Sequence, residues 1–263
     1  MQSNGRSAMV PRRTTRSRDT APRVVVISPD VAASVEWATR LHKACAPRFV
    51  VRAWGDQLAY EYLRRASGVL ALLDSPGPEP TDDLVQRIRS LRLLAPVTVS
   101  VSTRVDCAAL LAAGAVNVLR RNTSENAIAA RIEADLRWLR RGGPAAHGDT
   151  SVPGIGPDRR PGPLRPYRSQ SLLLEILLGA QGPLCCHDVR WLLGEASRPM
   201  SLRALRARIE RLAPHLARHG LTCDRSVRWG ADTFTLHPLA GGTAAPARGE
   251  TDTMDETAEL LPA

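Results

Sequence analysis

The sequence predicts two domains in series: an α/β domain with a doubly wound parallel sheet, and a smaller α+β domain of three helices and a hairpin. Between residues 23 and 141, short apolar runs alternate five times with segments of helical periodicity, the order of a parallel sheet covered on both faces. Between residues 169 and 237, three apolar helical segments precede two short runs typical of strands. Residues 142–168 are rich in Gly and Pro and lack periodicity, so we expect them to form the linker.

The five strands expected in the first domain are short and apolar. The first, at residues 24–27, contains no polar residue, which is typical of a strand buried on both faces of a sheet. The expected strands cover residues 24–27, 49–51, 69–73, 97–101 and 116–119, and the expected helices cover 31–46, 58–66, 84–94, 107–113 and a long segment that starts at Ser124.

The second domain contains one long amphipathic helix, expected to start after Ser201 and to stop at Gly220. Ser201 is a candidate N-cap, since its hydroxyl can accept a bond from an N–H of the first turn that has no partner in the helix. Pro214 removes a backbone hydrogen bond, so we expect a kink or an end near Ala213. The apolar stripe of this helix, at spacings of three and four, consists of Leu202, Leu205, Ile209, Leu212 and Leu216.

Around this helix the sequence has the outline of a winged helix-turn-helix. Two shorter helices are expected upstream, at residues 172–178 and 187–193. Downstream, strands at residues 226–229 and 233–236 flank a turn at 230–232. Because the long helix exposes arginines and leads directly into a basic hairpin, we expect this part of the chain to enter double-stranded DNA.

The DNA contacts expected from this outline come from the helix and the hairpin. Helix arginines can each form two hydrogen bonds to guanine, worth about 1–3 kcal/mol of discrimination. Hairpin arginines would contact phosphates or the minor groove and add salt-dependent affinity. Glu210 is expected to form an ion pair with Arg206 on the helix surface. The expected DNA-binding residues are Ser201, Arg203, Arg206, Ala207 and Arg211 of the helix, with Arg225 and Arg228 of the hairpin.

Composition narrows the class of partner. The formal net charge of +10 favours a polyanion, although a GC-rich genome also enriches arginine, and Lys43 is the one lysine. No apolar run approaches the roughly 20 residues that span a bilayer, and no secretory signal is present, so we expect a cytoplasmic, nucleoid-associated protein without a membrane partner. The five cysteines lack the paired spacings of a zinc site, and no metal or cofactor is expected. Residues 1–22 and 238–263 are expected to be disordered polar tails.

Three short segments resemble response regulators of the OmpR type. Residues 113–119, Ala-Gly-Ala-Val-Asn-Val-Leu, are similar to the Ala/Leu-Gly-Ala-Asp-Asp-Tyr-Leu segment of that family's fifth strand. Residues 72–74, Leu-Leu-Asp, followed by Pro78, are similar to the phosphoacceptor strand, and residues 208–212 resemble the Ile-x-Arg-Leu core of the recognition helix. The resemblance spans residues 23–237 and implies a flavodoxin-like receiver domain followed by a winged helix-turn-helix.

The departures from that family point to an atypical, orphan regulator. Two acidic residues that hold Mg²⁺ in the family correspond to Ser28 and Pro29, and proline offers no ligand. Asp30 is expected to cap the next helix. The family's lysine corresponds to Arg121, which is not equivalent to it, and its Thr/Ser column falls at Val101 or Ser102. The expected degenerate phosphorylation pocket therefore comprises Ser28, Asp30, Asp74, Ser102 and Arg121.

The resemblance implies a sequence-specific transcriptional regulator that works without phosphorylation. Atypical receivers of this kind are known among actinobacterial regulators; some form constitutive dimers and others sense a small molecule. Here it implies a homodimer formed through residues 105–139, in which each winged domain binds one half-site. Two alternatives stay open: a conventional two-component regulator phosphorylated on Asp74, and a non-specific, architectural nucleic-acid-binding protein. An enzyme is not expected, because no Gly-rich phosphate loop follows Ile27 and no nucleophile–base pair is recognisable.

Overall fold

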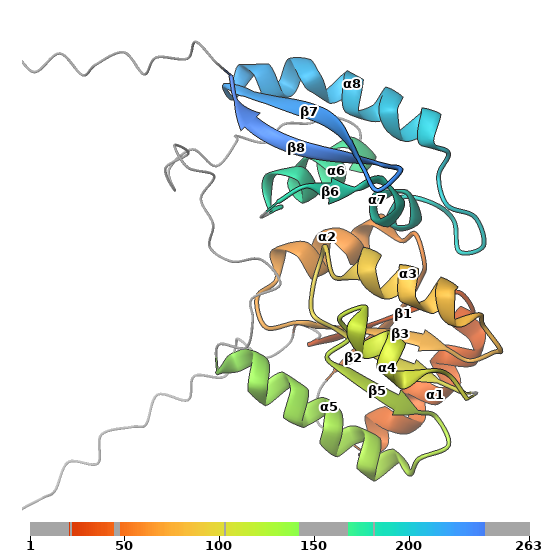
Figure 1. Ribbon diagram of the computed structural model, residues 1–263. Coiled ribbons are helices and arrows are strands. Elements are labelled where there is room, and N and C mark those ends of the chain that lie inside the picture. The colour runs from red at the N-terminus through yellow and green to blue at the C-terminus, as the bar shows by residue number, and fades with distance from the viewer. Residues whose placement is uncertain are drawn as a thin grey trace, which may run out of the picture.

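The computed structural model of the chain describes residues 21, 23–44, 48–102, 104–141, 168–180 and 182–239. These residues form an α/β domain and a smaller α+β domain packed directly against each other (Figure 1). Residues 1–20 and 22 of the expected N-terminal tail lie outside the described residues, as do nearly all of the expected linker and the C-terminal tail from residue 240.

The first domain is built on a five-stranded parallel sheet in the order β2-β1-β3-β4-β5, the flavodoxin-like order. The central strands β1 and β3 are buried along their whole length, as their unbroken apolar runs predict. The register pairs Val26 of β1 with Leu72 of β3, so both strands end at the same edge of the sheet. The strands are β1 (Val24–Ser28), β2 (Phe49–Ala53), β3 (Leu70–Ser75), β4 (Val97–Val101) and β5 (Asn117–Arg120).

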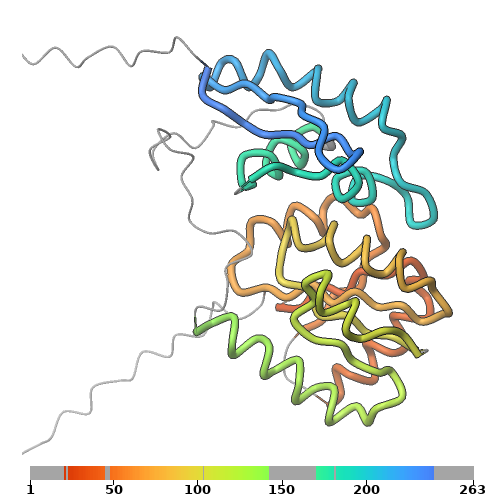
Figure 2. The backbone as a smooth tube through the Cα atoms, viewed as in Figure 1, coloured from red at the N-terminus to blue at the C-terminus, as the bar shows by residue number. Residues whose placement is uncertain are grey.

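Helices cover both faces of this sheet, which confirms the doubly wound fold (Figure 2). On one face, Trp37 and Leu41 of the first helix and Ile128 and Ile132 of the fifth enclose a core with Val26. The other three helices cover the opposite face. The helices are α1 (Val31–Ala44), α2 (Gln57–Arg65), α3 (Thr81–Leu91), α4 (Cys107–Ala112) and α5 (Glu125–Arg140).

The second domain consists of three helices and a three-stranded antiparallel sheet in the order β6-β8-β7, as expected for a winged helix-turn-helix. The two-residue strand β6 was not predicted, because a dipeptide has no measurable periodicity. The elements are α6 (Arg168–Leu178), β6 (Leu184–Cys185), α7 (Cys186–Leu192), α8 (Leu202–Arg218), β7 (Leu221–Arg228) and β8 (Ala231–Pro238).

Two local features of this domain differ from the expected ones. Helix α8 does not end near Ala213 but continues through Pro214, because Leu216 beyond it is buried and holds the last turn against the domain. The turn of the hairpin is not at 230–232 but at Trp229 and Gly230, whose φ values of 53° and 75° are those of a type I′ turn. Type I′ turns favour Asn-Gly, so the Trp-Gly pair gave no indication of the turn.

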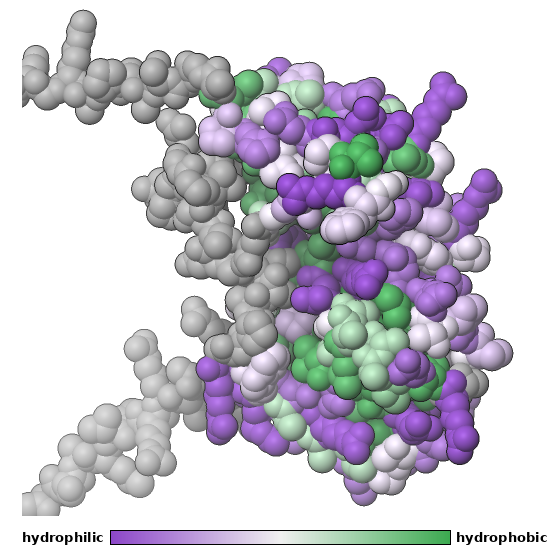
Figure 3. All heavy atoms as spheres, in the orientation of Figure 1, coloured by the Kyte–Doolittle hydropathy of each residue, from purple (hydrophilic) through white to green (hydrophobic). Residues whose placement is uncertain are grey.

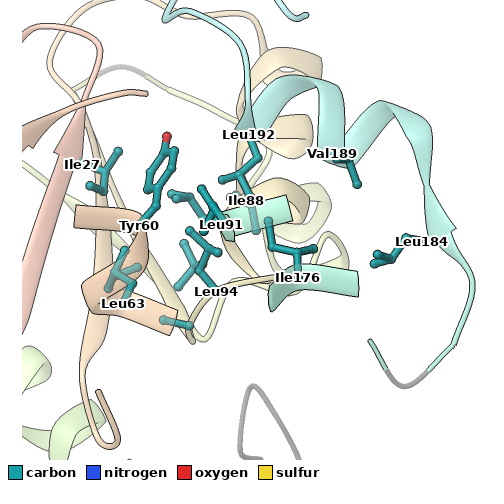
Figure 4. Packing of buried hydrophobic residues seen from close by; sticks show 14 of the residues in the cluster. Ile27, Tyr60, Leu63, Ile88, Leu91, Leu94, Ile176, Leu184, Val189 and Leu192 are labelled. Atoms are coloured by element: carbon teal, nitrogen blue, oxygen red, sulfur yellow. The ribbon is translucent and has the colours of Figure 1, made fainter. Parts of the chain in front are cut away.

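One hydrophobic core continues from the first domain into the second. Ile88 and Leu91 of α3 lie close to Ile176 of α6 and Leu192 of α7 (Figure 4). Polar contacts surround this core, including a bond of 3.1 Å from Trp54 Nε1 to the Trp191 backbone oxygen. The two domains therefore meet through α2 and α3 on one side and α6 and α7 on the other.

Candidate functional site

Helix α8 has one buried side and one free side. Ser201 caps it, since the backbone N–H of Ala204 donates to the Ser201 hydroxyl over 3.2 Å. Its apolar stripe is buried at Leu205, Ile209, Leu212 and Leu216, as expected. The receiver-like domain contacts α6 and α7, and α8 lies on the side of the winged domain away from it (Figures 1 and 2). The free side of α8 is therefore open to a large partner.

The expected helix contacts lie on or beside that free side. Ser201, Arg203 and Arg211 are exposed, and Ala207 between them is half-buried. At 1.5 Å per residue, the eight positions from Arg203 to Arg211 span about 12 Å along the helix. The major groove of DNA, about 12 Å wide, admits an α-helix, whose diameter with side chains is about 10–12 Å.

Arg206 has a different partner from the one expected. Its guanidinium lies 2.7 Å from Asp232 Oδ2 in an ion pair, whereas Glu210, its expected partner, is exposed. Asp232 is buried at the start of β8, and its carboxylate also accepts a bond of 2.8 Å from Arg206 Nε. Arg206 therefore joins α8 to the hairpin. The pair links positions 26 residues apart, so helical spacing could not predict it.

The hairpin presents a basic and partly apolar surface. Arg225 and Arg228 are exposed on β7, as expected for contacts with DNA. Val227 and Trp229 are also exposed, with 67% and 103% of their reference surface accessible. Trp229 was missed in the sequence because it was assigned to a strand and not to a turn, and Val227 because an apolar strand residue gives no sign of its exposure.

Asp74 lies at the carboxyl end of β3 with its side chain completely buried. The Ser34 hydroxyl of α1 lies 2.5 Å from Asp74 Oδ2, and Arg121 Nε lies 3.4 Å from Asp74 Oδ1. Arg121 is itself held by the Trp37 ring, 5.1 Å from its guanidinium carbon, and by a bond of 3.0 Å to the Ala33 backbone oxygen. Ser34 and Arg121 thus each lie against one of the two carboxylate oxygens of Asp74.

Burial raises the pKa of the Asp74 carboxyl above its usual range, against the opposing effects of Ser34 and Arg121. The Ser28 hydroxyl donates to the Asp30 backbone oxygen at 2.9 Å, and the Ser34 hydroxyl lies 2.8 Å from Ser28 Oγ as well as beside Asp74.

The structure brings together only part of the expected pocket. Ser28, Asp74 and Arg121 converge, and Ser34 joins them. Asp30 does not; its carboxylate caps α1 by accepting from the Ala33 N–H at 3.1 Å, as expected. Ser102 does not contact Asp74 either, because it is exposed and bonds the Ser75 backbone oxygen. Ser34 could have been found from its position one turn after Asp30, in a helix that follows a central strand.

No group of three or more potential metal ligands occurs within the described residues. The four cysteines in this part of the chain, Cys107, Cys185, Cys186 and Cys223, are free thiols. None of the described helices is both long enough and apolar enough to cross a membrane.

Comparison with known proteins finds likeness in solved structures alone: no protein-family model and no curated protein matches the chain. An orphan response regulator of H. pylori is 23% identical, over 46% of this chain and 100% of its own, with a TM-score of 0.31. The response regulator DrrB of Thermotoga maritima, an OmpR/PhoB homologue, is 17% identical over 81% and 99%, with a TM-score of 0.31. A streptococcal redox sensor evolved from two-component response regulators is 14% identical over 83% and 100%, with a TM-score of 0.32.

Proposed function

We propose that this protein is a sequence-specific regulator of transcription that binds double-stranded DNA through α8 and the β7–β8 hairpin. The observation that carries the proposal is the free side of α8, where Arg203 and Arg211 stand about 12 Å apart. The hairpin beside it supplies Arg225 and Arg228 for the phosphate backbone. The Arg206–Asp232 ion pair holds the helix and the hairpin together. The helix can then enter one major groove while the hairpin contacts the DNA beside that groove.

The receiver-like domain acts in this proposal without phosphorylation and without catalysis of its own. The support is the buried state of Asp74, which is covered by Ser34 and paired with Arg121. Asp30, the nearest replacement for a metal-binding carboxylate, is already used as a helix cap. Phosphoryl transfer to Asp74 would require further carboxylate ligands for Mg²⁺ and an accessible Asp74, whereas the Asp74 side chain is completely buried and its neighbours are Ser34 and Arg121.

The same domain joins two copies of the chain. Helix α4 has the sequence Cys-Ala-Ala-Leu-Leu-Ala, without a charged residue, and exposes Ala108, Leu111 and Ala112 at helical spacing. Figure 3 shows an apolar area over this part of the receiver-like domain. Two linked winged domains would bind paired half-sites with much higher affinity than one, because the second binding event is intramolecular.

The test is selection from a random duplex library with the full chain at near-physiological salt. Enrichment of a paired motif is expected, and Arg203→Ala should abolish the preference at one position of each half-site. Arg89→Ala removes the same charge from an exposed position on α3 and should leave the motif unchanged. Binding that shows no motif and simply fades as salt rises would leave a non-specific, architectural protein in place of the proposed regulator.

Phosphorylation is tested with acetyl phosphate. Intact-mass measurement should find no phosphoryl group on the wild-type chain, and Asp74→Asn should bind the selected motif as tightly as the wild type. Incorporation that disappears in Asp74→Asn, together with tighter DNA binding, would support a conventional two-component regulator.

A further inference from the structure

Trp229 occupies a backbone conformation that its side chain does not favour. With a φ of 53°, it is the one non-glycine residue of the described chain in the left-handed region. The first central position of a type I′ turn is usually Asn, Asp or Gly, which tolerate this conformation. The chain therefore keeps a large aromatic residue at a position where a smaller polar one would fold more easily.

The indole of Trp229 is also fully exposed, at 103% of its reference surface. Trp37 and Trp54, by comparison, are at least 95% buried. Val227, two residues before Trp229, is exposed as well. An aromatic side chain contributes most when it is buried, so this one does nothing for the stability of the isolated domain.

The hairpin holds Trp229 in a fixed place relative to α8. The β7–β8 ladder is paired up to Arg228 and Ala231, immediately on either side of the turn. The Ser226 and Thr233 hydroxyls lie 2.8 Å apart across the strands, and the Arg206–Asp232 ion pair fastens the end of the hairpin to the recognition helix. The indole is thus presented by a rigid support beside the surface proposed to contact DNA.

The charges around Trp229 select the kind of partner. Arg225 and Arg228 are both exposed and, being three residues apart, lie on opposite faces of β7. The nearest acidic residue, Asp232, is already paired with Arg206. A partner for this hairpin tip must therefore be strongly anionic on both sides and must accept a flat apolar ring between the charges. Stacked base pairs flanked by two phosphate backbones meet both requirements.

We propose that Trp229 inserts between base pairs from the minor groove, next to the half-site bound by α8, and kinks the duplex there. This inference rests on the proposed duplex-binding function. Insertion unstacks one base step, and flexible pyrimidine–purine steps such as TA and CA unstack most easily. Trp229 would thus add a preference for such a step at a position where the protein makes no hydrogen bond to a base.

The experiment uses the full-length chain and the duplex obtained by selection. A 2-aminopurine placed at successive flanking steps reports unstacking, and fluorophores at the two DNA ends report bending. Trp229→Asn should abolish both signals and weaken binding about tenfold, in line with the usual contribution of one stacked aromatic. It should leave the salt dependence unchanged, since no phosphate contact is removed. Arg228→Ala is the matched control, which should reduce the salt dependence and keep the unstacking signal.

Stability separates a contact with DNA from a structural role. Because Asn tolerates the left-handed conformation, Trp229→Asn should melt at or above the temperature of the wild type. A marked fall in melting temperature would assign Trp229 to folding and overturn the inference. The wild type could select a motif while Trp229→Asn still unstacks the DNA. That result would also overturn the inference about Trp229, and it would leave the proposed function intact. If the wild type selects no motif, both the proposed function and the inference about Trp229 are overturned.

Discussion

The guanidinium carbon of Arg87, in α3 of the receiver-like domain, lies 5.2 Å from the ring centroid of Trp191, in α7 of the winged domain. The same group lies 4.7 Å from the ring of Trp54 in the receiver-like domain. Arg87 Nε donates to Glu79 at 2.5 Å, and an N–H of its guanidinium donates to the Ala196 backbone oxygen. A buried cation between indoles of two domains requires both rings in place, so it favours one arrangement of the domains.

Replacing Arg87 should therefore destabilise the whole molecule. Arg87→Met leaves the Glu79 carboxylate, which is only 12% exposed, without its cationic partner and with only the Ser75 hydroxyl as a donor. We expect a loss of about 3–5 kcal/mol in the free energy of unfolding, which is typical of breaking one side of a buried pair. Urea denaturation followed by far-UV circular dichroism measures it. Arg89→Met, on the exposed side of the same helix, should change stability by no more than about 0.5 kcal/mol. Equal effects of the two variants would contradict the prediction.

Because Asp74 is buried, it should make the folded protein less stable as pH rises. Burial raises the pKa of its carboxyl from the ordinary value of 3.8, so the folded state binds this proton more tightly than the unfolded state does. The resulting stability is present below the unfolded pKa and is lost as pH rises through the folded pKa. The side chain of Asp74→Asn stays neutral at every pH. The free energy of unfolding of this variant should therefore increase relative to that of the wild type as pH rises from about 4 to 7. Urea titrations at several pH values test this, and a difference that stays constant with pH would contradict it.

The strands and helices of the first domain were predicted closely from the sequence, because each is specified by the pattern of apolar residues within its own segment. The expected strand at residues 97–101 is β4 as observed, and the apolar run before Asp74 continues as β3 through Ser75. The contacts that define the sites are not local. Ser34 meets Asp74 across 40 positions, and Trp54 meets Trp191 across 137. No periodicity encodes such pairs, so the pocket was only half predicted and the domain interface was not predicted at all.

Arg206 and Asp232 should act as a unit that positions the hairpin. Arg206→Met and Asp232→Asn should each lower the affinity for the selected duplex, and the double variant should lose little more than either single one. The coupling in stability should be about 1 kcal/mol, since Arg206 remains 40% exposed and water screens part of the pair. A double-mutant cycle, read by duplex titration and by urea denaturation, measures both quantities. If Arg206 contacts a base directly, Asp232→Asn alone would preserve affinity, and the two single variants would differ.

Helix α4 should carry the contact between two copies of the chain. Leu111 is 48% exposed in the middle of an uncharged helix face, so Leu111→Glu would place a charge where a second copy must bury apolar surface. We expect the variant to sediment as a monomer at concentrations where the wild type is a dimer. Its affinity for the paired motif should fall to that for a single half-site, because the second binding event is no longer intramolecular. Leu58→Glu is the matched control, since Leu58 is 57% exposed on α2, away from α4. If both variants remain dimeric, α4 is not the dimer contact; if only Leu58→Glu dissociates, the contact lies at α2.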